Sequence, residues 1–341
     1  MANERAAHVA AYVRSILERD GISPEDLPVQ SAPSIKPSAS GKGPVARPAL
    51  APSDVDLVRK IQNDQSLSPQ EVVRVEAIVI PNGLRPAFDI AHDSYEQLPA
   101  TWDRLNDRRA DLIPVIRSIG RVDLTGHPTK VFAGTACVVS PDLLLTNRHV
   151  AELFIDGVGD APSLHFKPGI TASIDLKQEI STSDSIPLTI TAPALVLDSW
   201  DASLLRVTGL PPGIAPLPLA SVALPGLDNR LAAVVGFPAI DEHSDLVQQI
   251  TIFRGVFFKK RLMPGRLTGF KPTDSFGRSV NALAHDCTTL GGNSGSALID
   301  VESGQVVGLH FAGTPLVSNF AVPTWELARD PRISQAGVHF V

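Results

Sequence analysis

The chain is 341 residues long, 43% of them hydrophobic, and carries a net charge of −6 at neutral pH. An acidic balance argues against nucleic acid or an anionic membrane surface as the main partner. No window approaches the roughly 20 apolar residues of a membrane span, and the charged start has no apolar run of signal-peptide length. These features predict a cytoplasmic protein with no nucleic-acid partner and no membrane partner.

The first 115 residues are expected to form three segments. Residues 1–26 have an amphipathic pattern over residues 3–19, which predicts a helix that either recruits a regulatory partner or caps the body. Residues 27–53 hold six prolines and no acidic residue, a composition typical of a linker. Residues 54–115 are expected to be a mixed helix and strand extension that packs on the rest of the chain.

Local signals predict the first elements of this extension. Ser53 is a candidate N-cap for a short helix over residues 54–62. A capping box with proline at the first helical position occupies residues 68–71. Residues 76–80 have the composition of a strand.

The last part of the extension is expected to be helical. Helical spacing runs over residues 102–119 but is interrupted by Pro114. Because the residue before a proline is pushed out of helical geometry, this helix is predicted to end near Leu112.

From residue 116 onward, short apolar runs separated by glycine, proline, asparagine and aspartate favour a β-barrel or a sandwich. The expected strands are residues 131–139, 143–146, 163–166, 188–190, 204–207, 231–236, 249–258 and 306–311. Residues 116–341 are therefore predicted to be one domain made of two halves, which divide near residues 208–230.

Three short motifs carry the chemistry. Residues 146–150 read Thr-Asn-Arg-His-Val, residues 201–205 read Asp-Ala-Ser-Leu-Leu, and residues 291–296 read Gly-Gly-Asn-Ser-Gly-Ser. A serine hydroxyl is a weak nucleophile that needs a base within hydrogen-bond reach, and that base needs a third group to fix its tautomer. These residue types assign catalytic roles to Ser294 as nucleophile, His149 as general base and then acid, and Asp201 as the orienting carboxylate.

The glycines around Ser294 have a role of their own. They let the chain turn so that the N–H groups of Gly292 and Ser294 point into one oxyanion hole. Asp198 lies three residues before Asp201, but only Asp201 opens a strand start, so Asp201 is the favoured acid.

The order of the three motifs discriminates among folds. The α/β-hydrolases run serine, acid, histidine, and the subtilisin order has the acid first. The order that remains is that of the chymotrypsin-like double barrel. The predicted fold class is therefore all-β: a chymotrypsin-like double six-stranded β-barrel with a partly helical N-terminal extension.

With further motifs, these residues resemble the trypsin-like serine peptidases of bacteria, and within them the glutamyl endopeptidase branch. The resemblance covers roughly residues 118–323 and also rests on Gly-Thr-Ala at 134–136, Val-Gly-Phe-Pro at 235–238 and Val-Gly-Leu-His-Phe at 307–311. It implies a serine endopeptidase that cleaves proteins or peptides through an acyl-enzyme, with no metal and no cofactor.

The resemblance also implies substrate-binding residues. Those that would pair with the substrate main chain as an added strand are Phe311, Ala312 and Gly313. Trypsin-like enzymes that select Arg or Lys have an aspartate six residues before the serine, where this chain has Thr288. Thr289 and His310 match the positions where glutamyl endopeptidases receive a carboxylate. An acidic preference, or a pocket for small or apolar side chains with His310 in its wall, is left open.

Two rival interpretations are kept. A high-temperature-requirement-type protease belongs to the same class, but the 31 residues after His310 (311–341) leave no room for a C-terminal peptide-binding domain. In the other, the barrels are a catalytically silent binding or regulatory module recruited through the N-terminal helix. Such a module would be indifferent to Ser294→Ala, whereas a protease would lose most of its activity.

The remaining polar clusters are expected to be structural or solvated. The histidines expected in loops or at the surface, without metal-ligand spacing, are His127, His165, His243 and His285. The basic residues expected to form a solvated hairpin face are Arg254, Lys259, Lys260, Arg261 and Arg266. Cys137 and Cys287 are expected to be two reduced, buried thiols.

Overall fold

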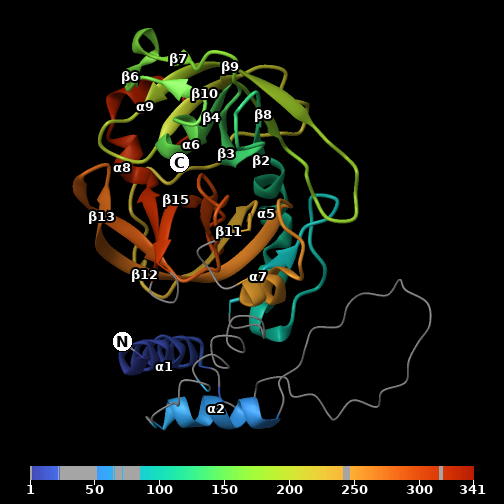
Figure 1. Ribbon diagram of the computed structural model, residues 1–341, viewed down its shortest axis with the longest axis vertical. Coiled ribbons are helices and arrows are strands. Elements are labelled where there is room, and N and C mark those ends of the chain that lie inside the picture. Colours follow the sequence, from blue (N-terminus) through green and yellow to red (C-terminus); the bar gives the residue numbers. More distant parts are fainter. Residues whose placement is uncertain are drawn as a thin grey trace. The chain divides into compact units, whose positions relative to one another are not determined.

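The computed structural model describes residues 2–21, 23, 52–63, 65, 71, 85–240, 246–314 and 318–341. The chain divides into two compact units, one made of Met1–Pro86 with Ser244–Gly255 and the other of Ala87–His243 with Val256–Val341. Every strand that the structure describes lies in the second unit, where two barrels lie one above the other (Figure 1).

Six antiparallel strands close into the first barrel, because the order β10-β4-β3-β2-β8-β9 is completed by pairing of β9 with β10. These strands are β2 (Ile119–Thr125), β3 (Phe132–Ser140), β4 (Leu143–Thr146), β8 (Thr171–Asp175), β9 (Pro187–Val196) and β10 (Ser203–Val207). Three short strands extend it: β6 (Gly159–Asp160) adds to β9, and β5 (Ile155–Asp156) pairs with β7 (His165–Phe166).

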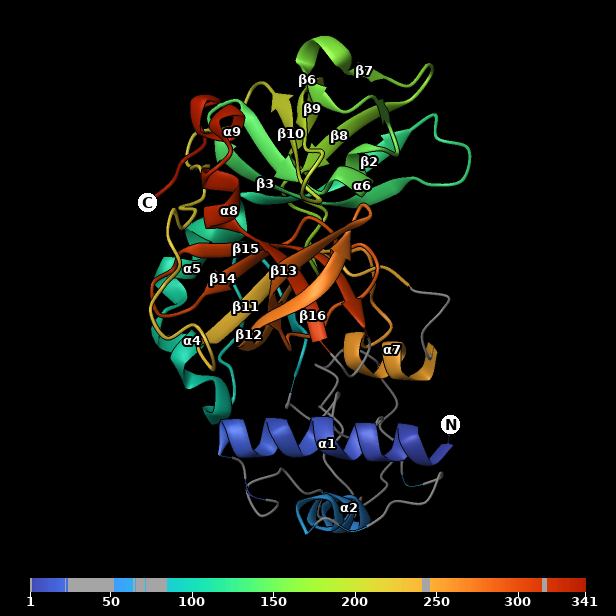
Figure 2. The ribbon, with the colours of Figure 1, turned by 90° about the vertical axis from the view of Figure 1, so that its left-hand side faces the viewer.

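The second barrel is closed in the same way. Its order β12-β11-β14-β15-β16-β13 is completed by pairing of β12 with β13, and β1 (Phe88–Asp89) adds to the outside of β12. These strands are β11 (Leu231–Gly236), β12 (Arg261–Ser275), β13 (Arg278–His285), β14 (Ala297–Asp300), β15 (Val306–Thr314) and β16 (Ser318–Pro323). Figure 2 shows the curved strands of this barrel beneath the first. The fold is thus the predicted all-β, chymotrypsin-like double barrel.

The run of three leucines in β4 illustrates why apolar residues are consecutive here. Leu144 belongs to the core inside the first barrel, whereas Leu143 and Leu145 belong to a second core that continues into the other barrel. Successive side chains of a strand point to opposite faces, so burial of both faces requires an unbroken apolar run. The segment between the barrels runs from the end of β10 to the start of β11, within the predicted division at 208–230.

Short helices complete the second unit. They are η3 (Ala100–Trp102), α4 (Asp103–Asp107), α5 (Arg109–Arg117), α6 (Arg148–Ala151), η4 (Ala161–Ser163), α8 (Thr324–Ala328) and α9 (Pro331–Gln335). The predicted helix end near Leu112 is wrong, because α5 continues through Pro114 to Arg117. Burial of Leu112, Val115 and Ile116 on one face of α5 outweighs the hydrogen bond that the proline cannot make.

The first unit contains three described helices: α1 (Ala2–Asp20), α2 (Pro52–Gln62) and α7 (Leu246–Phe253). α1 contacts α2, and Arg14 Nε donates to the carbonyl oxygen of Ile61 at 3.0 Å. α2 starts at Pro52, so Ser53 lies in its first turn and does not cap it; proline is favoured at a first helical position. No helix within the described ranges has the length and apolar character needed to cross a membrane.

The strand expected over residues 249–258 is wrong. The structure has helix α7 there, and Gln249 and Phe253, four residues apart, are both buried. That spacing places both side chains on one helical face. Of the linker expected over residues 27–53, Pro52 and Ser53 belong to helix α2, and residues 27–51 lie outside the described residues. The expected capping box at 68–71, apart from Glu71, and the expected strand at 76–80 also lie outside them.

The predicted boundary at 115/116 differs from the one between the compact units. The unit that contains both barrels starts at Ala87. Within it, β1 pairs with β12, and Arg104 bonds Glu302 through two contacts of 2.6 Å. Residues 87–115 therefore belong with the barrels.

Lys260 and Arg261 are fully buried, which corrects the expectation of a solvated basic face. Lys260 Nζ donates to the carbonyl oxygens of Leu176 at 2.6 Å and Ile116 at 3.0 Å, and lies 4.0 Å from Glu179. Burial lowers the pKa of Lys260 to about 8, against the opposing attraction of Glu179. These contacts join the start of β12 to the end of α5 and to the segment after β8.

Candidate active site

The pairing of β4 with β10 brings the predicted base and acid together. Thr146 at the end of β4 lies opposite Ser203 at the start of β10. His149 follows three residues later in the one-turn helix α6, and Asp201 comes two residues before Ser203. Because antiparallel strands place these two ends at the same edge, residues 52 apart in sequence become neighbours.

Two hydrogen bonds hold Asp201 against His149. His149 Nδ1 lies 2.6 Å from Asp201 Oδ2, and the backbone N–H of His149 donates to Asp201 Oδ1 at 3.0 Å. Asn147 Nδ2 also donates to the carbonyl oxygen of Asp201 at 2.7 Å. A carboxylate can only accept, so Nδ1 carries the proton and Nε2 is the free acceptor of the neutral ring. Asp201 is buried, whereas the His149 side chain is 40% exposed.

Ser294 lies in the loop between β13 and β14, between two glycines with left-handed backbone geometry. Gly292 has φ +86° and Gly295 has φ +88°. A Cβ on Gly295 would come within 1.9 Å of the carbonyl oxygen of Thr135, so only glycine fits. The glycines predicted from the motif are therefore required by the turn and by close approach to β3.

Backbone hydrogen bonds anchor the loop to both barrels. Thr135 of β3 donates its N–H to the Ser294 carbonyl oxygen at 2.8 Å and its hydroxyl to the Gly292 carbonyl oxygen at 2.9 Å. On the other side, Gly295 N–H donates to the carbonyl oxygen of His310 on β15 at 2.9 Å. The loop is thus fixed at the barrel junction.

Two glycines of the other motifs permit this approach. A Cβ on Gly134 would lie 2.9 Å from both the Ser294 carbonyl oxygen and Val150 Cγ2, so the serine loop and α6 meet there. A Cβ on Gly236, at the end of β11, would lie 1.9 Å from Ser296 Oγ. Both motifs are therefore part of the packing that brings Ser294 next to the helix of His149.

The wall formed by β15 and β13 contains two buried histidines. His310 Nδ1 lies 3.2 Å from His285 Nε2. Burial, with His285 and His149 nearby, holds the pKa of His310 well below its usual value, and burial lowers the pKa of His285 to about 3. Both rings are therefore neutral near pH 7. His285 is fully buried, which corrects its expected position in a loop or at the surface.

Thr289 has a partner that the sequence analysis missed. Its hydroxyl donates to Asn319 Oδ1 at 2.8 Å, and Asn319 Nδ2 donates to the carbonyl oxygen of Cys287 at 2.7 Å. Thr288 and Thr289 are both partly exposed. Asn319 lies on β16 opposite Gly313, beyond every motif of the resemblance, so no local signal marked it.

The other predicted residues have these places. Along β15, Phe311 is buried, Ala312 is partly exposed and Gly313 is exposed. Asp198 contacts Arg278 and Arg332 rather than a histidine. Cys137 and Cys287 are buried and form no disulfide, as expected. Within the described part of the chain, no three His, Cys, Asp or Glu side chains gather as a metal-ligand set.

Two closed antiparallel barrels, with a His–Asp pair and a glycine-flanked serine at their junction, define a protein of the chymotrypsin-like peptidase class. Residues 134–309, just over half of the chain, match the trypsin-like peptidase domain. The chain belongs to this family.

Two of the known proteins similar to this chain are named as proteases. A probable serine protease of Lysobacter enzymogenes is 29% identical over 301 residues, which cover 78% of this chain and 76% of that protein. The active form of the Rv3671c protease from M. tuberculosis is 20% identical with a TM-score of 0.46, covering 74% of this chain and 93% of that one. Deg5 is 16% identical with a TM-score of 0.48, covering 71% and 100% respectively.

Proposed function

We propose that the protein is a serine endopeptidase that hydrolyses peptide bonds through an acyl-enzyme on Ser294. The observation that carries this proposal is the geometry of His149, whose Nδ1 and backbone N–H both contact the buried carboxylate of Asp201. This geometry supports a base with a fixed tautomer at the junction where the Ser294 loop is anchored. Family membership supports peptidase activity independently.

In the proposed mechanism, His149 Nε2 takes the proton of Ser294 Oγ while Oγ attacks the carbonyl carbon of the peptide bond. The N–H groups of Gly292 and Ser294 stabilise the oxyanion of the tetrahedral intermediate. His149 then gives the proton to the leaving amine, the C–N bond breaks, and the acyl group remains on Ser294. A water molecule, deprotonated by His149, attacks the ester carbonyl carbon. The bond to Ser294 Oγ then breaks, His149 returns the proton to Oγ, and the acid product is released.

We further propose that the residue before the cut is Glu or Asp. His310 is neutral. When Nε2–H of His285 donates to Nδ1 of His310, the single proton of the His310 ring is on Nε2, and this N–H can donate to a carboxylate. The Thr289 hydroxyl is a second proposed contact for the carboxylate, although in this structure the hydroxyl donates its proton to Asn319 Oδ1. A buried or half-buried carboxylate needs such donors, whereas an apolar side chain gains nothing from them.

An unbiased peptide library, read by mass spectrometry, tests both proposals. The purified protein is compared with Ser294→Ala and with Ser334→Ala, which changes an exposed serine on α9 as a matched control. Cuts after Glu or Asp are expected in the wild type and in Ser334→Ala, and should be lost in Ser294→Ala. A loss of roughly 10³-fold or more is the scale for removing the nucleophile of such a triad.

The library separates the two parts of the proposal. Cuts after small or apolar residues would keep the peptidase and reject the acidic preference. Cleavage that persists in Ser294→Ala would reject the role of Ser294. Labelling by a serine-reactive fluorophosphonate, present in the wild type and absent in Ser294→Ala, checks the nucleophile without any assumption about the peptide.

A further inference from the structure

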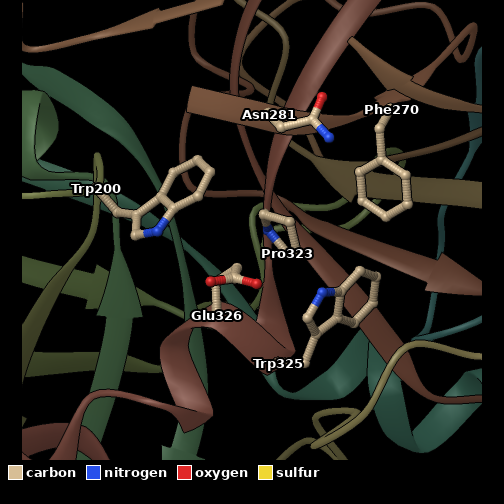
Figure 3. Close-up of a pocket in the computed structure, with 6 residues that line it drawn as sticks. All are labelled: Trp200, Phe270, Asn281, Pro323, Trp325 and Glu326. Atoms are coloured by element: carbon tan, nitrogen blue, oxygen red, sulfur yellow. The ribbon is translucent and has the colours of Figure 1, made fainter. Parts of the chain in front are cut away.

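A cleft with three aromatic side chains in its lining lies at the loop that carries Asp201. It has a volume of about 320 Å³, and its lining residues are Trp200, Phe270, Asn281, Pro323, Trp325 and Glu326. Figure 3 shows Trp200 on one side of the hollow and Phe270 and Trp325 on the other, with the Glu326 carboxylate between them. Trp200 directly precedes Asp201 in the chain, which connects the cleft to the catalytic groups.

The walls of this cleft come from both barrels and are held in place. Trp200 lies in the loop between β9 and β10, whereas Phe270 and Asn281 lie on β12 and β13. Arg278 of β13 contacts Asp198 of the same loop at 3.2 Å, an exposed ion pair that links the two walls. The rings of Phe270 and Trp325 meet edge to face with centroids 6.1 Å apart. The cleft is therefore built before any ligand enters.

Its lining indicates the charge of the occupant. Ring faces carry partial negative charge and attract Arg and Lys side chains, while the only charged residue that lines the cleft is the carboxylate of Glu326. Glu326 already pairs with a guanidinium, that of Arg329, the C-cap residue of α8. The Arg329 side chain is 72% exposed, so this pair is weak and an incoming cation can replace it.

We propose that this cleft is a second substrate-binding site that receives an Arg or Lys side chain of the polypeptide, at a position away from the cut. This rests on the proposed peptidase function, because the polypeptide must also occupy the catalytic site. A single carboxylate and three rings bind a free cation only weakly. Held on the same polypeptide, the cation binds at high effective concentration, and modest contacts become useful. The cleft selects substrates independently of the residue before the cut.

Binding is measured first in a Ser294→Ala background, which holds the peptide uncut. The probe is a 12-residue peptide of Gly, Ser and Ala with one Glu, which can occupy the catalytic site, and one Arg. It is compared with the same peptide in which citrulline, a neutral isostere, replaces Arg. Intrinsic fluorescence reports directly, because two of the three tryptophans line the cleft and the third, Trp102, is buried elsewhere. The Arg peptide is expected to bind at least fivefold more tightly than the citrulline peptide, and Glu326→Gln should remove that difference.

A matched variant controls for loss of any carboxylate. Glu302→Gln removes an exposed carboxylate in the turn between β14 and β15, where it pairs with Arg104. It should leave the fivefold preference unchanged. Trp200→Leu, a second change in the cleft, should weaken Arg binding and leave citrulline binding within twofold. Urea unfolding midpoints of all the variants establish that each is folded.

Kinetics then test selection. In peptides with a fixed cleavage residue, Arg is moved one position at a time along both flanks, with citrulline at each position as reference. One window of positions is expected in which Arg raises kcat/KM about tenfold in the wild type and less than twofold in Glu326→Gln. Short peptides that lack a cation should be cut equally by both proteins.

Three results would overturn the proposal. The first is equal binding of the Arg and citrulline peptides. The second is a preference for Arg that persists in Glu326→Gln. The third is binding of free arginine amide as tight as that of the peptide, which would make the cleft a small-cation site. Failure of the peptidase function is recognised separately, since no peptide would then be cut by the wild type. The binding difference would in that case assign the cleft to a catalytically silent protein.

Discussion

His149 and His310 lie at the same barrel junction, but their surroundings differ. His149 Nδ1 faces the Asp201 carboxylate at 2.6 Å and its ring is partly open to solvent. His310 Nδ1 faces a second imidazole, His285, at 3.2 Å, and both rings are buried. A carboxylate stabilises a ring that gains a proton, whereas burial beside another imidazole opposes it. The same residue type is thus suited to proton transfer in one place and to neutral hydrogen bonding in the other.

The largest expected effect follows from removing the charge beside His149. In Asp201→Asn the amide can donate to Nδ1, which favours the wrong tautomer and leaves no acceptor at Nε2. We expect kcat/KM to fall about 10³- to 10⁴-fold. Asp142→Asn is the matched control, because that exposed carboxylate pairs with Arg206 and takes no part in either proposed site, and it should change kcat/KM less than threefold. A fall of less than tenfold in Asp201→Asn would contradict the assigned role.

The second effect concerns stability at acid pH and comes from the buried pair. The unfolded chain protonates His285 below about pH 6.5, but the folded protein does not do so until about pH 3. The unfolded state therefore binds more protons in this window, and the free energy of unfolding decreases as the pH falls from 6.5 towards 3. For His285 this amounts to about 2–3 kcal/mol between pH 7 and pH 4.5.

Urea unfolding at pH 7 and at pH 4.5 measures this decrease. His285→Gln, which does not titrate, should lose less stability between the two pH values than the wild type does. His165→Gln is the control, since that side chain is 70% exposed. Equal pH dependence in the wild type and His285→Gln would show that the buried imidazole is not protonated on unfolding.

The smallest effect tests how the wall near His310 receives a carboxylate. In Thr289→Val the shape is kept but the hydroxyl is lost. Because the Thr289 hydroxyl is shared with Asn319, we expect the preference for Glu over Ala before the cut to fall only about three- to tenfold. The kcat/KM for the Ala peptide should stay within twofold, as it should for both peptides in the control Thr191→Val. A change in both peptides alike would indicate a structural role for Thr289.

Much of the fold could be predicted because local sequence patterns specify several of its strands and turns. The strands at 143–146 and 231–236 were located to the residue, since leucine or valine runs bounded by polar or turn residues are typical of barrel strands. The Ser294 loop could be predicted because two of its three glycines, Gly292 and Gly295, have positive φ angles that favour glycine. Strand burial and turn geometry restrict the residue types at a few consecutive positions, so they can be recognised in the sequence.

The errors have a common cause in contacts between distant residues. A short apolar run such as residues 249–258 is compatible with a strand and with one face of a helix. In the folded protein the packing of its side chains favours the helix. The burial of Lys260 depends on carbonyl oxygens 84 and 144 residues away in the chain. Closure of the second barrel buries His285 and places Asn319 beside Thr289. No local pattern encodes such partners.

The buried ammonium group of Lys260 also has an experimental consequence. Burial lowers the pKa of this amine to about 8 in the folded protein. An opening that exposes the amine to water removes that cause, and the amine then reacts with acylating reagents as an ordinary exposed lysine does. In the folded protein it is covered and bound to the carbonyl oxygens of Ile116 and Leu176. The rate at which Lys260 is acylated, read by peptide mass, therefore measures how often the contact between the barrels opens. The chain carries its own chemical reporter of that motion.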